Sequence, residues 1–448
     1  MREKDFDSAR MSRQAVSIFR AALAEVDPEC LIRKAVRRRG RRLFVQRKTI
    51  DLGSFENIFL VAFGKAAPYM AKSLSQVLGG RLSRGIAICR PDQSLSDNRI
   101  LCLPASHPLP DRKSVKAAQE ILGLAKKAGH KDLVFVLISG GGSAQACLPQ
   151  SPVTLAEKRW VTKELLKAGA GIAELNTLRK HMSAIKGGRL AEAAFPAKVV
   201  NLVISDVIGN DLENIASGPS YWDSSTYEDA IGVLKKYGLW GKAPRSLREV
   251  LLSGAAGKRP ETLKRGNLVF KNVSTFLIGD NHQALKAAAR KASGLGFHTA
   301  ILTASDSGEA RMAARGYISL LEKIAHSRKS PQKPFCLLAG GELTVRVKGK
   351  GRGGRNTEFV LAALTELGNE LPLLVASLGS DGVDGATDAA GAWATPATAA
   401  RARQLGLDAK KYLRNNDSYN FFKKAGGLII TGPTRTNVMD LRLFLLSL

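Results

Sequence analysis

The sequence predicts an α/β protein of two lobes, each containing a mostly parallel sheet flanked by helices. Short apolar runs, typical of strands buried on both faces, alternate with stretches of helical periodicity. This alternation occurs twice, on either side of a polar, glycine-rich and basic stretch at 253–267. The 448 residues also suffice for two or three domains. We therefore expect an N-terminal lobe over residues 1–252, a connection over 253–267 and a C-terminal lobe over 268–448.

The N-terminal lobe begins with an amphipathic helix, because apolar residues recur at three- and four-residue spacing between Ala15 and Val26. The pair Asp27-Pro28 ends this helix. Farther along, apolar runs predict buried strands at 58–63, 85–89, 133–139 and 199–205. Helical periodicity predicts helices at 66–78, 114–128, 155–170 and 178–194. Strands that alternate with helices in this way imply a parallel sheet.

The C-terminal lobe repeats the same theme. The expected strands lie at 274–279, 299–303, 335–339 and 373–378, and the expected helices at 283–293, 309–326 and 357–367. The segment 342–348 alternates apolar residues with Thr, Arg and Lys, which predicts a half-exposed strand in a hairpin.

The composition is that of a globular protein, with 44% hydrophobic and 24% charged residues. No apolar run approaches the roughly 18 to 20 residues of a membrane-spanning helix, so we expect no membrane partner. No secretory signal pattern is seen, which predicts a cytoplasmic protein. The five cysteines form no C-x-x-C pair, so we expect neither a disulfide framework nor a zinc knuckle.

The chain is strongly basic, with a formal net charge of +29. Its densest basic stretch, residues 31–50, contains no acidic residue and includes Arg37, Arg38, Arg39, Arg41 and Arg42. This stretch is either a patch for a polyanion or part of a generally basic surface. The remaining excess charge is dispersed along the chain, which favours the second interpretation. We therefore do not expect nucleic acid as a partner.

Two glycine clusters of the N-terminal lobe directly follow predicted strands, where open α/β sheets bind ligands. In the first, Gly64 and Lys65 would meet an anion held by backbone amides. The second consists of Ser139, Gly140, Gly141, Gly142 and Ser143. Successive glycines allow the backbone to approach a phosphate and direct N–H groups toward it. The alternatives are a surface role for the lysine and a glycine turn needed only for packing.

In the C-terminal lobe, residues 349–356 formally match G-x-G-x-x-G, but neither a buried strand before them nor an acid after the next strand supports a dinucleotide site. Arg352 and Arg355 instead suit bidentate binding of a phosphoryl group or a carboxylate. Gly353, Gly354 and Asn356 complete this expected binding loop. A solvated basic hairpin tip is the alternative.

The remaining candidates are two carboxylates and two cations. Asp206 and Asp381 each follow a predicted strand and are candidate Mg²⁺ ligands. Asp381 lies in an acidic, glycine-rich loop at 379–388, and for Asp384 and Asp388 of this loop turn and helix-cap roles are the alternative to a metal role. Arg179 and Lys186 share one face of the helix predicted at 178–194, where they would meet an anion or water.

Taken in order, these stretches resemble the class II glycerate 2-kinases, whose C-terminal half carries the MOFRL domain. The motifs that carry the resemblance are FGKA from Phe63, SHPLPD from Ser106, SGGGSA from Ser139, LNTLRKHMSAIKGGRLA from Leu175, GDN from Gly279, GGE from Gly340, GRGGRN from Gly351, GSDGVDGATDAAGA from Gly379 and NNDSY from Asn415. The resemblance implies a Rossmann-like N-terminal lobe, a MOFRL C-terminal lobe and an active site between them.

The resemblance also implies an activity: ATP-dependent, Mg²⁺-dependent phosphorylation of D-glycerate at its 2-hydroxyl, giving 2-phosphoglycerate. The family's catalytic lysine matches Lys65 and its active-site arginine matches Arg355, with Glu342 lining the same cleft. We expect Lys65 and Arg355, from opposite lobes, to meet at the transferred phosphoryl group. The alternatives are an NAD(P)H-dependent hydroxypyruvate reductase and a nucleic-acid-binding protein with a kinase-like body. A homodimer is also left open.

Overall fold

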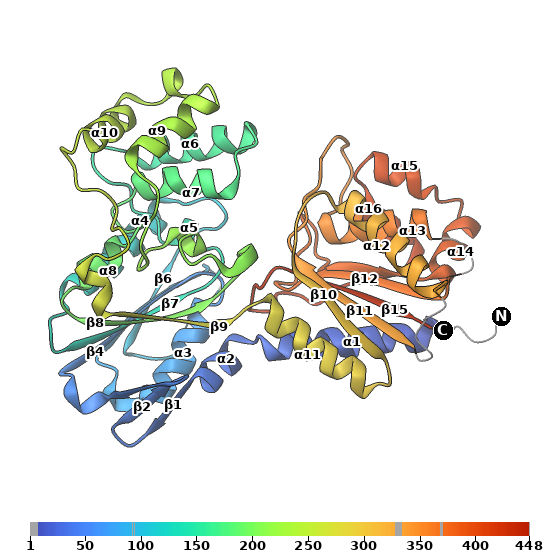
Figure 1. The fold of residues 1–448 in the computed structure, drawn as a ribbon, viewed down its shortest axis with the longest axis horizontal. Helices are drawn as coiled ribbons and strands as arrows, with labels where there is room; N and C mark the ends of the chain where they lie inside the picture. Colours follow the sequence, from blue (N-terminus) through green and yellow to red (C-terminus); the bar gives the residue numbers. More distant parts are fainter. Residues whose placement is uncertain (1–7, 92, 94, 328–333, 368–370, 448) are drawn as a thin grey trace. The chain divides into compact units, whose positions relative to one another are not determined.

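The computed structural model describes residues 8–91, 93, 95–327, 334–367 and 371–447. The chain divides into two compact units, both drawn in Figure 1. One unit is Pro28–Ile278, and the other combines Met1–Asp27 with Gly279–Leu448. This division differs from the expected one, because the first helix belongs with the C-terminal half of the chain rather than with the lobe that follows it.

A six-stranded sheet, in the order β6-β5-β4-β7-β8-β9, is the centre of the unit Pro28–Ile278. Its strands are β4 (Asn57–Phe63), β5 (Arg84–Cys89), β6 (Ile100–Pro104), β7 (Asp132–Ile138), β8 (Lys198–Ile204) and β9 (Val273–Gly279). The strands from β6 to β8 pair in parallel, and β7 is buried along its whole length. The parallel sheet expected from the apolar runs is therefore confirmed, although β6 was not predicted.

Helices cover this sheet and also form a separate cluster beyond it (Figure 1). The helices with contacts to the strands are α3 (Ala67–Leu78), α4 (Arg112–Lys126) and α8 (Arg189–Ala194). The separate cluster consists of α6 (Leu155–Lys167), α7 (Ile172–His181), α9 (Tyr227–Lys236) and α10 (Arg245–Ala255). It has its own apolar core, in which Tyr227 is fully buried.

The single helix expected at 178–194 is wrong. The chain leaves the helical conformation after His181 and regains it only at Arg189. Gly187 and Gly188 between them have φ values of 60° and 83°, a backbone conformation that glycine adopts readily and that a helix excludes. Arg179 and Lys186 consequently do not share a helix face.

The basic run folds into the short helix α2 (Pro28–Ala35) and a three-stranded antiparallel sheet. The strands are β1 (Val36–Arg39), β2 (Arg42–Val45) and β3 (Lys48–Asp51). Two of its arginines have partners within the same unit: Arg38 donates hydrogen bonds to the carbonyl oxygens of Leu78 and Gly40, and Arg41 pairs with Asp51 at 3.4 Å. Part of this positive charge therefore serves the fold.

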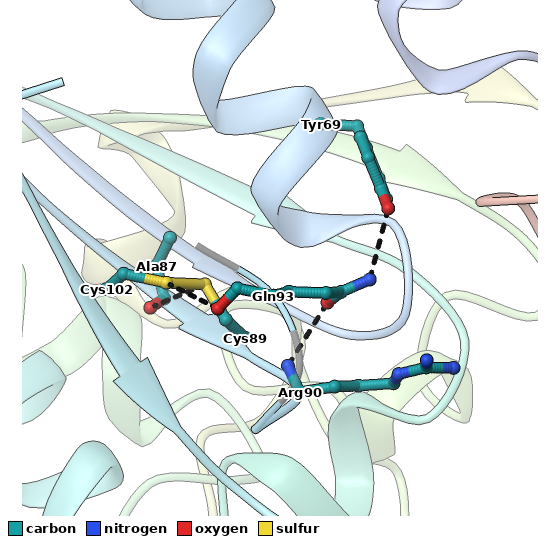
Figure 2. The surroundings of a disulfide bond; sticks show 6 residues. All are labelled: Tyr69, Ala87, Cys89, Arg90, Gln93 and Cys102. Carbon is teal, nitrogen blue, oxygen red and sulfur yellow. Dashed lines mark hydrogen bonds between the residues drawn. A yellow bond between two sulfur atoms is a disulfide. The ribbon is translucent and has the colours of Figure 1, made fainter. Parts of the chain in front are cut away.

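A disulfide joins Cys89, at the end of β5, to Cys102 on the neighbouring strand β6 (Figure 2). The cysteine spacing indicated no disulfide framework, and this one bond forms because parallel pairing of the strands brings the two Cα atoms to 6.1 Å from each other. Close by, the Gln93 side chain accepts a hydrogen bond from the Arg90 N–H and donates one to the Tyr69 hydroxyl. Cys30, Cys147 and Cys336 are free thiols.

The second unit is built on a six-stranded sheet in the order β10-β11-β15-β12-β13-β14. Its strands are β10 (His298–Asp306), β11 (Phe335–Gly341), β12 (Leu373–Gly379), β13 (Gly391–Ala394), β14 (Leu428–Ile429) and β15 (Asp440–Leu446). Only β10 and β11 pair in parallel, since β15 lies antiparallel between β11 and β12. The α/β class is confirmed, but a mostly parallel sheet is wrong for this unit.

Helices cover both faces of the second sheet (Figure 1). On one face lie α1 (Ser8–Glu25) and α11 (Asn281–Gly294). On the other lie α12 (Ala310–Ala325), α13 (Arg355–Glu366), α14 (Pro396–Gln404), α15 (Ala409–Arg414) and α16 (Ser418–Ala425), over a core that includes Phe359 and Phe444. The strand expected at 342–348 is wrong, because only Thr344 makes a β-bridge there. Of the helices that the structure describes, none has the length and apolar character needed to cross a membrane.

Candidate functional site

One candidate site lies where the strand order of the parallel sheet reverses. From β4 the chain proceeds to β5 and β6 on one side and then returns to β7 on the other. Gly64 follows β4 and Ser139 follows β7, and these two strands are parallel neighbours. Open α/β sheets bind ligands at the carboxyl ends of their strands at such a reversal. The two glycine clusters of the N-terminal half therefore flank the expected ligand position.

Close backbone contacts fix the geometry of these two clusters. Gly64 has a φ of 113°, and a Cβ atom added there would lie 2.3 Å from Ser139 Oγ and 2.4 Å from its carbonyl oxygen. Ser139 Oγ accepts a hydrogen bond from the Ala66 N–H at 3.0 Å, and the Lys65 N–H donates to the Gly140 carbonyl at 2.8 Å. Only glycine fits at position 64, and the lysine backbone is held directly against the second cluster.

The Lys65 side chain runs along this loop. A Cβ atom on Gly141 would lie 3.4 Å from Lys65 Cγ and 2.9 Å from His107 Cδ2, so the lysine stem and the imidazole both face Gly141. Among the residues that the structure describes, no acceptor receives the backbone N–H groups of Gly140 and Gly141. Two amides beside a half-buried lysine are a suitable place for phosphate oxygens.

Hydroxyl and amide groups continue from this loop toward the predicted cations. Ser143 Oγ lies 2.7 Å from Ser217 Oγ, which donates to Asn176 Oδ1 at 2.9 Å. Arg179 Nη1 also donates to Asn176 Oδ1, at 3.4 Å. Lys186 is completely buried and donates to the Ala216 carbonyl oxygen at 3.0 Å. The structure thus brings both predicted cations to this loop, although not through a shared helix.

A second, separate candidate site lies in the other unit, at one edge of its sheet. Asp440 begins β15 and is paired in register with both Gly341 and Gly379, the last residues of β11 and β12. Its buried carboxylate accepts hydrogen bonds from Arg355 Nε at 2.6 Å and Arg355 Nη2 at 2.9 Å. Arg355 Nη1 pairs with Glu342 at 2.9 Å. Although burial opposes it, Asp440 raises the pKa of Arg355, so this guanidinium stays charged.

Two N–H groups of Arg355 remain for a ligand. A guanidinium has five donors, and the two carboxylates use three of them. The side chain is 32% exposed, whereas that of Asp440 is fully buried. Arg355 is therefore oriented from behind and keeps an accessible edge, the arrangement that bidentate binding of an anion requires.

The loop before Arg355 is shaped by the acidic loop that follows β12. Asp384 accepts hydrogen bonds from the backbone N–H groups of Asn356 at 2.9 Å and Thr357 at 2.8 Å, which caps the start of α13. A Cβ atom on Gly354 would lie 2.4 Å from the Asp384 carboxyl carbon. Of the two roles open for this acidic loop, helix capping is the one that Asp384 fills.

The other predicted members of the binding loop at 349–356 have structural contacts. Asn356 is buried and donates to Asp440 Oδ1 at 3.1 Å. A Cβ atom on Gly353 would lie 2.3 Å from Ser418 Oγ. Arg352 is exposed, and its guanidinium lies 4.9 Å from the centre of the Tyr419 ring, a cation–π contact.

The two predicted Mg²⁺ ligands belong to different units. Asp206 follows β8 and is half-buried. Asp381 follows β12 and accepts a hydrogen bond from the Val383 N–H at 3.1 Å, which is a turn role. Within the described ranges, no group of three or more His, Cys, Asp or Glu side chains converges on one point. In many proteins Mg²⁺ is held by only one or two carboxylates, together with substrate phosphates and water. Asp206 and Asp381 fit Mg²⁺ binding of this kind.

Sequence reasoning missed several residues that organise the candidate sites around Lys65 and around Arg355. Asp440 orients Arg355, and Ser217 links the glycine loop to Asn176. A third buried cation, Lys158, lies beside Cys147 near Arg179 and Lys186. The apolar run after Asp440 was a usable signal for a strand, whereas nothing local marks Ser217 or Lys158 as part of a site.

Comparison with known proteins finds relatives that match nearly the whole chain. Residues 14–252 match the family model described as a domain of unknown function, DUF4147, and residues 335–440 match the MOFRL family. A D-glycerate 2-kinase from Thermotoga maritima is 40% identical over 97% of this chain and 98% of its own. A glycerate 2-kinase from Pyrococcus horikoshii is 40% identical, with 93% of each chain covered. The crystal structure of a glycerate kinase from Thermotoga maritima superposes with a TM-score of 0.83 at 39% identity, covering 98% of this chain and 100% of that one.

Proposed function

Because the chain belongs to the class II glycerate kinase family, which carries the MOFRL domain, we propose that it transfers the γ-phosphoryl group of ATP to the 2-hydroxyl of D-glycerate. The observation that carries this proposal is the place of Lys65, beside two amides at the reversal of the strand order. The same function is the one the motif series implies. The ATP donor, the Mg²⁺ ion and the residue roles are our proposals.

The reaction joins one oxygen to phosphorus and releases another. The 2-hydroxyl oxygen attacks the γ-phosphorus, the bond from that phosphorus to the β,γ-bridging oxygen breaks, and ADP leaves with the bond electrons. The hydroxyl proton passes to a base, for which Asp206 is the candidate at this sheet edge. Such a reaction depends mainly on positioning and on neutralising the negative charge of the phosphoryl oxygens.

Each candidate residue has a role in that neutralisation. Lys65 and the N–H groups of Gly140 and Gly141 bind phosphoryl oxygens, with Gly64, Gly142, Ser139 and Ser143 shaping the loop that presents them. Arg355 binds the same phosphoryl group through its accessible edge, held in orientation by Asp440 and Glu342. Bound Mg²⁺ neutralises phosphate charge, and Asp206 or Asp381 would hold it.

The carboxylate of glycerate needs a cation of its own. Arg179 is suited to this role because it is only partly buried and lies one amide side chain away from the Ser143–Ser217 pair. Lys186 lies behind it in the buried interior. We assign Arg179 the direct contact with the carboxylate.

The test is identification of the product formed from D-glycerate, ATP and Mg²⁺, together with a pair of lysine variants. Lys65→Ala should lower kcat by roughly 10²–10³-fold, the cost of one transition-state donor. Lys72→Ala changes an exposed lysine on the helix that follows and serves as the matched control. NADH oxidation with hydroxypyruvate and no ATP consumption would overturn the proposal in favour of a reductase.

A double-mutant cycle tests whether Lys65 and Arg355 serve the same phosphoryl group. If they do, the combined variant Lys65→Ala/Arg355→Ala should cost less than the product of the two single effects. Strictly multiplicative effects would show that the two residues act in separate steps.

A further inference from the structure

Three cationic side chains of the unit Pro28–Ile278, two buried and one partly exposed, lie close enough to act on one another electrostatically. Lys158 is on α6, Arg179 is on α7 and Lys186 is in the irregular segment before α8. The two lysines are 4% and 0% exposed. Burial of a charge is costly unless it is paired and hydrogen-bonded, so such a group needs a counter-charge or must lose its proton.

The described residues provide no carboxylate for this cluster. Lys186 donates to a backbone carbonyl oxygen and Arg179 donates to an amide oxygen. Among the described residues, buried Lys158 Nζ has no oxygen acceptor, and its polar neighbour is the sulfur of Cys147. The neighbouring group of opposite electrostatic effect is the buried Cys147, whose sulfur favours the charged forms of all three cations only as a thiolate. Burial, followed by repulsion from Lys158, lowers the pKa of Lys186 well below its ordinary value, and burial also lowers that of Lys158.

The carboxylates and cations nearby are committed to other partners. On α7 and the segments packed against it, Lys180 pairs with Asp223 at 2.5 Å and His181 pairs with Glu261 at 2.9 Å. Glu174 at the start of α7 pairs with Lys236 and accepts a hydrogen bond from Tyr237. The positive charge of the three-cation cluster is therefore not balanced from these elements.

The cluster is continuous with the glycine loop. Asn176 accepts hydrogen bonds both from Arg179 and from Ser217, which contacts Ser143. Lys186 donates to the carbonyl of Ala216, and a Cβ atom on Gly142 would lie 3.1 Å from the Ala216 methyl group. Arg179 is the partly exposed member, and both buried lysines lie within electrostatic reach of it, so an anion bound at Arg179 would act on them.

We propose that Lys158 and Lys186 form a proton-accepting pair behind Arg179, and that the acceptor's carboxylate binds at Arg179 together with uptake of protons by this pair. The inference rests on the proposed function for the identity of the acceptor. Lys158 and Lys186 are positioning residues, since they act on the carboxylate through the potential they create at Arg179. The bound anion supplies the missing counter-charge, which favours the protonated lysines.

Two measurements on the full chain test the pair: calorimetric binding of D-glycerate in buffers of different ionisation enthalpy, and the pH dependence of its Kd. The wild type should take up protons, and Kd should rise with pH through the lysine titration by up to about tenfold per pH unit for each proton. Lys158→Met should take up fewer protons on binding, and its Kd for D-glycerate should be higher by on the order of tenfold for the one lost charge. Lys158→Arg should restore affinity without restoring that uptake, because arginine keeps its proton.

A surface lysine and the neighbouring thiol provide the control variants. Lys163→Met changes an exposed lysine on α6 and should behave as the wild type. The inference is overturned if proton uptake is equal in the wild type, Lys158→Met and Lys158→Arg. It is also overturned if Cys147→Ala loses the proton uptake, because the thiol would then be the titrating group. If the wild type phosphorylates D-glycerate but binds it without proton uptake, only this inference fails. If it neither binds nor phosphorylates D-glycerate, the proposed function fails as well.

Discussion

Replacement of Asp440 by asparagine should disrupt both the stability of its unit and the orientation of Arg355. The Asp440 carboxylate is fully buried and accepts two hydrogen bonds from Arg355 and one from Asn356. Arg442 Nη1 lies 3.9 Å away and is also buried. The asparagine amide keeps the shape of the side chain but removes the negative charge between two arginines. Its NH₂ group would also face an N–H donor of Arg355, with which it cannot form a hydrogen bond.

The size of the effect follows from burial. Removing one partner of a buried ion pair costs about 3–5 kcal/mol, and Asp440→Asn should fall at the lower end of this range, because Arg355 keeps Glu342 and Arg442 keeps Asp306. Glu342 provides the matched control, since it pairs with the same guanidinium but its side chain is 44% exposed. Glu342→Gln should therefore cost no more than about 1 kcal/mol. Misorientation of Arg355 should also lower kcat by on the order of 10²-fold in Asp440→Asn.

Urea denaturation gives the free energy of unfolding of both variants, and initial rates with D-glycerate and ATP give kcat. Activity is compared at a temperature where the folded fraction of Asp440→Asn exceeds nine-tenths by the same denaturation curve. The reasoning is refuted if Asp440→Asn loses no more stability than Glu342→Gln and retains its turnover, because Asp440 then neither balances nor orients Arg355.

Three further predictions concern the unit Pro28–Ile278. Gly64→Ala should destabilise it and abolish turnover, because the added methyl group would meet Ser139 within 2.4 Å, whereas Gly80→Ala enters open space and should leave thermal stability and rate unchanged. Cys89→Ser should lower stability by about 3 kcal/mol and make thermal unfolding insensitive to reductant, because the disulfide closes a short loop with a sequence separation of 13. Against the opposing effect of burial, hydrogen bonds from His181 and the Thr262 N–H lower the pKa of Glu261 from 4.5 to about 2. Its carboxylate therefore stabilises the fold fully above pH 4.5 and loses this contribution as the pH falls toward 2, so Glu261→Gln should flatten the acid limb of a stability–pH curve.

The strands of the parallel sheet could be predicted from sequence because burial on both faces gives continuous apolar runs, as in β4 and β7. The antiparallel strand β15 is also buried along its whole length, although it carries Asp440 and Arg442 among its leucines. Its place between β11 and β12 could not be predicted, since that depends on pairing between segments far apart in the chain. Pairing of β5 with β6 likewise determines the Cys89–Cys102 disulfide, which no cysteine spacing indicated.

In the candidate sites, too, local sequence signals could be read, whereas contacts between distant segments could not. Lys65 and the glycine loop could be predicted because each directly follows its strand, and a strand end is visible in the sequence. Arg355 could be singled out by its glycine-rich surroundings, but its partner Asp440 lies 85 residues away. The helix face predicted to carry both Arg179 and Lys186 is wrong, because two glycines with positive φ break that helix, although the two side chains still lie close enough to interact electrostatically.

The compartment of the protein stays a prediction, and the disulfide gives it a test. Stable disulfides are uncommon in the reducing cytoplasm, apart from that of hyperthermophiles. Counting free thiols in protein taken directly from cells under alkylating conditions distinguishes a protein with three thiols from one with five.

The central position of β15 also affects how the protein is made. Helix α1 is translated long before β15, yet their shared unit cannot complete its sheet until residues 440–446 have been translated and have inserted between two strands already synthesised. During that interval the facing edges of β11 and β12 lack their partner, a state prone to aggregation. Chains released before residue 440 would therefore be targets for chaperones and proteases, and they would lack the carboxylate that holds Arg355.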